Sequence, residues 1–204
     1  MSKKRSEALA YIAFDLGMNF QIKDEWGLLG LLKDFHLFKQ GSRKRIESVI
    51  QHKDGMLESE LHIFDYQYTI STGKTSATYK QTVFFMQSKK LGLPQFLMRP
   101  EHFFNKVSEW LHLSKDIDFV EYPQFSDQYW LQSKDEDYLR ATMHEFILHF
   151  FTIEKNWSLE GCNYYLIFYR NNYLFPPEKI KDFYKKGMEI CNMLYQDEYW
   201  DPRS

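Results

Sequence analysis

The chain has 204 residues, a formal net charge of −2 and an unusually high aromatic content, with 18 Phe, 14 Tyr and 5 Trp. This balance of charge gives no overall field that would draw the protein onto nucleic acid, so no nucleic-acid partner is expected. Two cysteines are too few for a disulfide framework or a zinc site, which favours a reducing, cytoplasmic setting. No stretch has the apolar core of a signal peptide or the length of a membrane span.

The first elements along the chain are helical. Ser6 is a suitable N-cap for a helix over residues 6–16, with Leu9, Ile12 and Ala13 on one face and Gly17 as its stop. Residues 25–38 are apolar and are predicted to form a short helix.

Strands dominate the next segment. Residues 45–51 and 56–70 are predicted strands joined by an Asp54-Gly55 turn, a dipeptide that favours hairpins. Residues 61–86 hold two β-prone runs around Ser71–Lys74, which predicts an antiparallel hairpin. Alternation places Phe64, Tyr66 and Tyr68 on one face of the first run, with Asp65 and Gln67 on the other. Residues 95–99 add a fourth strand to this meander.

The second half alternates helices and strands. Pro100 is predicted to open a helix that buries a stripe over residues 103–111. Residues 116–120 and 125–131 are predicted to be extended. Ser133 and Glu136 have capping-box spacing, which predicts one long helix through residue 151. A hairpin around Gly161 and a last helix after Pro176-Pro177 complete the set.

These elements predict an α+β fold, an antiparallel β-meander sheet with amphipathic helices packed on one face. We expect one domain over residues 1–204 with a loose tail at 197–204. Subdomains at 1–113 and 114–196, each a meander plus a helix, are the alternative.

Several segments form a string that is specific enough to serve as a family tag. They are Phe64-Asp65-Tyr66-x-Tyr68-Thr69, Gly73-Lys74, Gln81-Thr82-Val83, Leu93-Pro94-x-Phe96-x-x-x-Pro100-Glu101, Asp116-Ile117-Asp118-Phe119 and Pro123-x-Phe125-Ser126-x-x-Tyr129. Over residues 8–194 the chain resembles a family of uncharacterised bacterial proteins that carry this string. Its second half also resembles a larger bacterial domain of unknown function that is often found beside membrane helices. The resemblance implies no activity.

The polar positions of the predicted hairpin are the first candidate site. Asp65, Gln67 and Gln81, with Lys74 on the connecting loop, could form a binding surface on the wet face of the sheet. Asp is disfavoured within strands, so Asp65 is either exposed or held by a specific partner. Lys74, Lys80 and Arg99 are the partners considered.

Two charged clusters are alternatives. Asp116, Asp118 and Glu121 could bind Mg²⁺ or Ca²⁺ as part of a metal-assisted hydrolase. A solvated strand edge is the interpretation we favour, because such metal sites usually need more oxygen ligands. The basic run Arg43-Lys44-Arg45 could, with residues 3–5, attach the protein to an anionic membrane surface. Basic runs of this length are more often solvated turns.

The sequence contains no phosphate loop, dinucleotide fingerprint or nucleophile elbow, so we predict no cofactor and favour a protein that is not an enzyme. The function predicted is that of a non-catalytic cytoplasmic binding or scaffolding protein. Its partner is expected to be another protein, with a homo-oligomer as a second case.

Overall fold

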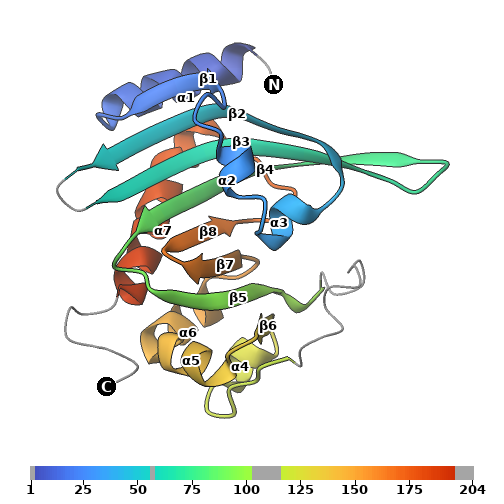
Figure 1. Ribbon diagram of the computed structural model, residues 1–204, viewed down its shortest axis with the longest axis vertical. Helices are drawn as coiled ribbons and strands as arrows, with labels where there is room; N and C mark the ends of the chain where they lie inside the picture. The colour runs from blue at the N-terminus through green and yellow to red at the C-terminus, as the bar shows by residue number, and fades with distance from the viewer. Residues whose placement is uncertain (1–2, 56–57, 103–115, 196–204) are drawn as a thin grey trace.

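The computed structural model describes residues 3–55, 58–102 and 116–195. Its centre is one eight-stranded antiparallel sheet in the order β1-β2-β3-β4-β8-β7-β5-β6, with helices around it (Figure 1). The predicted α+β class is therefore confirmed. The predicted helix stripe at 103–111 and the tail at 197–204 lie outside the described residues.

The strands differ greatly in length. They are β1 (Asn19–Lys23), β2 (Ser42–Asp54), β3 (Ser59–Ser71), β4 (Ser76–Ser88), β5 (Leu93–Pro100), β6 (Tyr129–Ser133), β7 (Ser158–Asn163) and β8 (Tyr165–Tyr169). Because β2, β3 and β4 have 13 residues each, they extend past their neighbours, and the β3–β4 hairpin projects from one side of the sheet (Figure 1).

The helices are mostly short. They are α1 (Lys3–Asp15), α2 (Leu28–Leu31), α3 (His36–Lys39), α4 (Pro123–Ser126), α5 (Glu136–Thr142), α6 (Glu145–Ile153), the 3₁₀ turn η3 (Pro177–Lys179) and α7 (Ile180–Leu194). The predicted first and last helices are present, and Gly17 has the left-handed φ of +69° expected after a helix end.

The β3–β4 pairing confirms the predicted hairpin. Asp65 lies opposite Thr82, Tyr66 opposite Gln81, and Gln67 opposite Lys80. Because opposite residues share a face, Gln81 lies beside Tyr66 and away from Asp65. The prediction that Asp65, Gln67 and Gln81 share one polar face is therefore wrong for Gln81.

The strand order departs from a simple meander. The C-terminal β7–β8 hairpin lies between β4 and β5, so β4 pairs with β8 and β5 pairs with β7 and β6. Strand β1 was not predicted from the sequence, because its five residues lack a strong run of β-branched side chains. The two halves of the chain thus contribute neighbouring strands to one sheet.

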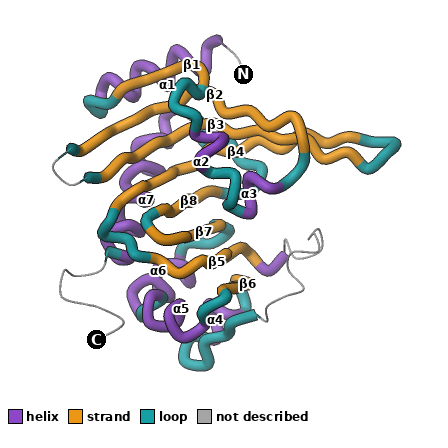
Figure 2. Tube along the Cα trace, in the orientation of Figure 1, coloured by secondary structure: helices purple, strands orange, loops and turns teal. Residues whose placement is uncertain are grey.

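Both faces of the sheet bury aromatic and aliphatic side chains. On one face the larger core joins α1, α6 and α7 to Phe84, Phe168 and Trp157. On the other, α2 and α3 cover Phe64 and Tyr66, so helices pack on this face in addition to the predicted one (Figure 2).

Three local predictions are wrong for identifiable reasons. Pro123 begins helix α4, so residues 125–131 are only partly extended. The N-cap of α5 is Asp135, whose carboxylate accepts a hydrogen bond from Tyr138 N at 3.0 Å, while Ser133 Oγ bonds to Gln95 O. The helix expected through residue 151 is divided into α5 and α6.

Gly161 is not in a turn. It lies within β7, where a Cβ would come 2.3 Å from the Phe96 ring, so the glycine allows close packing between β7 and β5. The chain reverses after Asn163, which has a left-handed φ of +53°.

Candidate functional site

Asp65, the central residue of the predicted binding surface, is buried with 1% of its surface exposed. Arg5 of α1 donates to both of its carboxylate oxygens, from Nε at 2.8 Å and Nη2 at 2.9 Å, and Thr82 Oγ1 donates at 2.9 Å. The structure therefore contains the buried ion pair, with Arg5 in place of the three partners considered from the sequence. Burial raises the pKa of the Asp65 carboxyl, and Arg5 acts in the opposite direction.

The residues that donate to Asp65 also bond to the segment before α7. Arg5 Nη1 donates to Phe175 O at 2.8 Å, and Phe175 N donates to Thr82 Oγ1 at 3.0 Å. We call Arg5, Asp65, Thr82 and Phe175 the root. Its hydrogen bonds fasten α1 and the segment before α7 to the middle of the β3–β4 hairpin, so Asp65 has a structural role.

Gln81 is also enclosed. Its Oε1 accepts from Asn172 N at 3.2 Å, and Asn172 Oδ1 accepts from Lys80 N at 3.1 Å. These bonds attach residues 171–173 to the part of β4 that extends past β8. Gln81 is fully buried, so it cannot touch a partner directly.

Beyond the root the three long strands form an extension that we call the arm, comprising residues 42–46 and 67–80 (Figure 1). Its two faces differ. Arg45, Gln67 and Lys80 are cross-strand partners and form a polar row on the face that includes Asp65. Tyr68 and Tyr79 stack on the opposite face, with ring centroids 5.3 Å apart.

The tip of the arm is ordered by its own hydrogen bonds. Thr72 N donates to Thr75 O at 2.9 Å, the two threonine hydroxyl oxygens lie 2.8 Å apart, and Lys74 N donates to Thr72 O. Gly73 has a φ of +79°, a conformation in which glycine avoids a steric penalty. Lys74 is thus presented on a defined turn and is exposed.

The start of the arm is braced by the loop before β2. A Cβ on Gly41 would lie 2.5 Å from Thr69 O, so this glycine allows the loop to approach the arm closely. Tyr68 Oη donates to Gln40 Oε1 at 3.3 Å, and Lys44 Nζ donates to Phe38 O at 2.6 Å. Such bracing reduces the entropy that would be lost on binding a partner.

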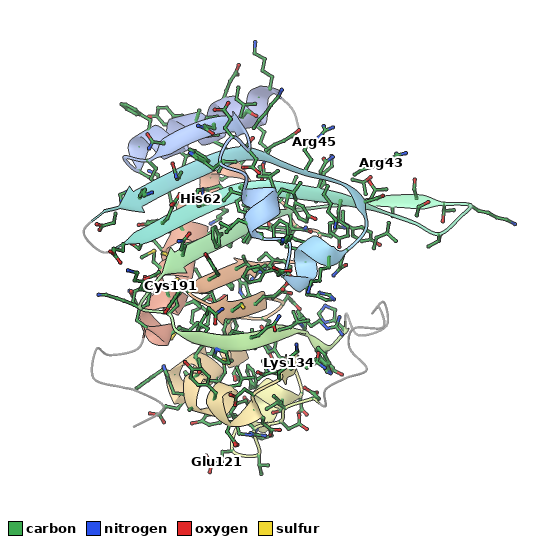
Figure 3. All side chains as sticks on the ribbon, in the orientation of Figure 1. Arg43, Arg45, His62, Glu121, Lys134 and Cys191 are labelled. Carbon is green, nitrogen blue, oxygen red and sulfur yellow. The ribbon has the colours of Figure 1, made fainter. Side chains whose placement is uncertain are left out.

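The arm is strongly basic. Its two segments contain Arg43, Lys44, Arg45, Lys74 and Lys80 and not a single Asp or Glu. Arg45 forms an exposed pair with Glu47 at 3.4 Å. Figure 3 shows Arg43 and Arg45 beside the start of the arm, far from Glu121 and Lys134 at the other end of the sheet. The arm is therefore cationic although the whole chain has a formal net charge of −2.

A second polar cluster surrounds the buried carboxylate of Glu160, which sequence reasoning did not single out. Its oxygens accept from His36 N at 2.6 Å, Leu37 N at 3.0 Å and Tyr169 Oη at 2.8 Å. Burial raises the pKa of Glu160 to about 7. Burial, aided by Arg99 and Lys39, lowers the pKa of His36 to about 4.

The cavity beside Glu160 and Cys162 has a volume of about 50 Å³. This is comparable to the space of one or two water molecules and is too small for a substrate. Glu160 satisfies two backbone N–H groups at the start of α3, which would otherwise have no acceptor inside the protein. The cluster therefore fits a structural role.

The structure does not assemble the predicted acidic cluster. Asp116 Oδ1 accepts from Leu131 N at 2.8 Å, so this carboxylate is engaged with the edge of β6. Asp118 and Glu121 are exposed, and residues 3–55, 58–102 and 116–195 contain no group of three or more His, Cys, Asp or Glu side chains placed to hold a metal ion. The alternative of a metal-assisted hydrolase is therefore not supported by the described residues, where one of its three carboxylates is bonded to the sheet.

The three basic residues near the N-terminus, Lys3, Lys4 and Arg5, lie in different environments. Arg5 points into the root, whereas Lys3 and Lys4 are exposed. In the described part of the chain, no helix combines the length and apolar character required to cross a bilayer.

Comparison with known proteins gives one fold relationship. No protein-family model and no curated protein sequence matches the chain. The crystal structure of the mycobacterial trehalose monomycolate transport factor A, TtfA, superimposes with a TM-score of 0.63 at 10% sequence identity, covering 94% of this chain and 93% of that one. At this identity the likeness establishes the shared fold and not a shared activity.

Proposed function

We propose that the protein is a non-catalytic, cytoplasmic binding protein whose arm recognises an acidic, extended segment of another protein. The observation that carries this proposal is the arm itself, a braced hairpin with five basic residues and no carboxylate in its two segments. The similarity to a transport factor is compatible with a binding role.

The contact residues are the two members of the predicted set that are not buried, half-buried Gln67 and exposed Lys74, together with the cross-strand neighbours of Gln67. Gln67 and Lys74 keep the binding role expected from the sequence, and Arg45 and Lys80 join them in the polar row. Asp65 fixes the root from which the arm projects, and Gln81 attaches residue 172 to the opposite face of β4. Charges placed on a rigid surface steer association and select partners more than they add affinity.

Site-specific photo-cross-linking tests the assignment. A photoreactive amino acid at Gln67 or Lys74 should capture a protein in the cells that make this chain, whereas the same amino acid at Glu189, on the exposed side of α7, should not. The captured protein is then identified by mass spectrometry, and a peptide covering its cross-linked segment serves as the probe for affinity measurements.

Charge reversal supplies the control. Lys80→Glu should weaken peptide binding at least about tenfold, equivalent to about 1.4 kcal/mol, and Lys80→Arg should retain it. Lys134→Glu, an exposed lysine at the far end of the sheet, should leave it unchanged (Figure 3). Adducts that survive Lys80→Glu would contradict the proposal. A second result would also contradict it. If the protein bound phosphatidylserine vesicles through Lys74 and Lys80 but did not bind the peptide, the surface would be a membrane contact.

A further inference from the structure

The two edges of the sheet are treated differently by the chain. At the β6 edge, Ile117 N donates to Leu131 O at 2.9 Å and Asp116 accepts from Leu131 N at 2.8 Å. Residues 116–117 thus occupy the outer hydrogen-bonding positions of β6. An edge covered in this way cannot pair with another chain.

The β1 edge has no comparable cover among the described residues. β1 pairs with β2 on one side, and none of the strands described here pairs with its outer side. Its sequence, Asn-Phe-Gln-Ile-Lys, contains no proline, and its one lysine is the only charge that could discourage pairing. Figure 1 shows β1 at the end of the sheet, with α1 alongside it.

Exposed apolar side chains gather at this edge. Ile22 of β1 is 64% exposed, and Tyr11 and Phe14 on the adjoining helix α1 are 72% and 81% exposed. Phe20 packs against the core shared with α1, and strand alternation places Ile22 on the same side of β1. An open strand edge combined with exposed large apolar residues marks an interaction surface.

The sequence of β1 is complementary to itself. In an antiparallel pair centred on Gln21, Phe20 lies opposite Ile22 of the other strand, Asn19 lies opposite Lys23, and the two Gln21 amides meet on the axis. Apolar residues then face apolar residues, polar residues face polar residues, and no like charges are opposed. This arrangement needs a two-fold axis, the commonest symmetry of protein dimers.

We propose that β1 is a dimerisation strand. It pairs antiparallel with β1 of a second copy about an axis at Gln21, so that the two sheets become continuous and the two α1 helices flank the junction. The proposal is independent of the arm, which lies on other strands and stays available to a partner in the dimer.

Hydrodynamic mass measurement tests this inference. Light scattering after size-exclusion chromatography should show a mass that rises from one chain to two over a roughly hundredfold range of concentration, as mass action requires. Ile22→Glu would bury a carboxylate against Phe20 of the other copy and should weaken dimerisation at least tenfold. Ile153→Glu changes an equally exposed isoleucine, 65% against 64%, at the end of α6 and should leave dimerisation unchanged.

Covalent trapping gives the register and does not rely on a destabilising change. Gln21→Cys should form an interchain disulfide on mild oxidation, because opposite Cβ atoms in an antiparallel pair lie about 5 Å apart. Lys134→Cys should not. A monomer at every concentration, or a dimer insensitive to Ile22→Glu and untrapped by Gln21→Cys, would overturn the proposal.

Discussion

The root and the arm belong to the same strands, yet they hold polar side chains in opposite environments. Asp65 and Thr82 form a cross-strand pair enclosed by Arg5, and two residues further along the same face Gln67 and Lys80 form the next pair, at the surface. The difference lies in what covers the side chains. Arg5 of α1 and Phe175, in the segment before α7, enclose Asp65 and Thr82, whereas Asn172 of that segment contacts the arm at the backbone N of Lys80. Polarity alone therefore does not identify a binding residue.

Removing the cation of the root should give the largest effect. Arg5→Ala leaves the buried Asp65 carboxylate without its charge partner and should lower the free energy of unfolding by about 3–5 kcal/mol. Urea denaturation measures it. Lys4→Ala, the exposed neighbour, should change stability by less than about 0.5 kcal/mol.

Two further variants keep this experiment decisive. Arg5→Lys retains the charge but loses the paired donors, so it gives a measurable intermediate loss if Arg5→Ala does not fold. Asp65→Asn in the Arg5→Ala background should recover part of the loss, since the uncompensated charge is gone. A cost below about 1 kcal/mol for Arg5→Ala would mean that the ion pair does not hold the root.

Glu160 is a second buried carboxylate to compare with Asp65. Asp65 is held by the Arg5 cation, whereas Glu160 accepts hydrogen bonds from two backbone N–H groups and a tyrosine hydroxyl. Its pKa is raised from 4.5 to about 7, so the folded protein binds this proton more tightly than the unfolded chain does. Its contribution to stability is therefore fully present below pH 4.5 and is lost as the pH rises to about 7. The loss should be on the order of 3 kcal/mol.

The effect is isolated by comparison with Glu160→Gln. His36, whose pKa is lowered to about 4, costs stability as the pH falls from 6.5, and this opposing effect is present in both proteins. Lys39, Arg99 and Tyr169 also face the carboxylate, and all three are present in both proteins. The difference in unfolding free energy between the two proteins should thus change between pH 4.5 and 7. A constant difference would show that Glu160 is ionised throughout.

The sequence predicted the hairpin well because its evidence is local. Alternation from Phe64 to Tyr68 and the turn at Gly73 lie within a short stretch, and the two faces they imply are those of the structure. The helix after Pro177 was predicted for the same reason, since its apolar stripe repeats within one segment.

Long-range partners could not be predicted in this way. Arg5 is 60 residues from Asp65, and nothing in either segment indicates that the first turn of α1 lies beside the middle of β3. The insertion of β7–β8 between β4 and β5 is likewise a choice among topologies that local patterns leave open. The face of Gln81 depended on a register set by a four-residue turn, and a shift of one residue reverses every side chain.

Substitutions at two glycines compare the braced start of the arm, at Gly41, with its tip, at Gly73. Gly41→Ala should lower the free energy of unfolding by about 3 kcal/mol, because its φ of +59° penalises a side chain and the added Cβ meets the backbone of Thr69. Gly73→Ala, with a φ of +79° and open space around it, should cost about 1 kcal/mol. Equal losses, measured by urea denaturation, would mean that the loop before β2 does not brace the arm.

The exposed cations of the arm should contribute least to stability. Lys74→Ala and Lys80→Ala should each change the free energy of unfolding by less than about 0.5 kcal/mol, because neither ammonium is buried. Basic side chains gathered on an arm without carboxylates repel one another, so removing one is as apt to raise stability as to lower it. Urea midpoints at low and high salt distinguish these cases, since salt screens the repulsion. A loss above 1 kcal/mol for Lys80→Ala would place this residue with the root, as a structural element, and would remove it from the binding surface.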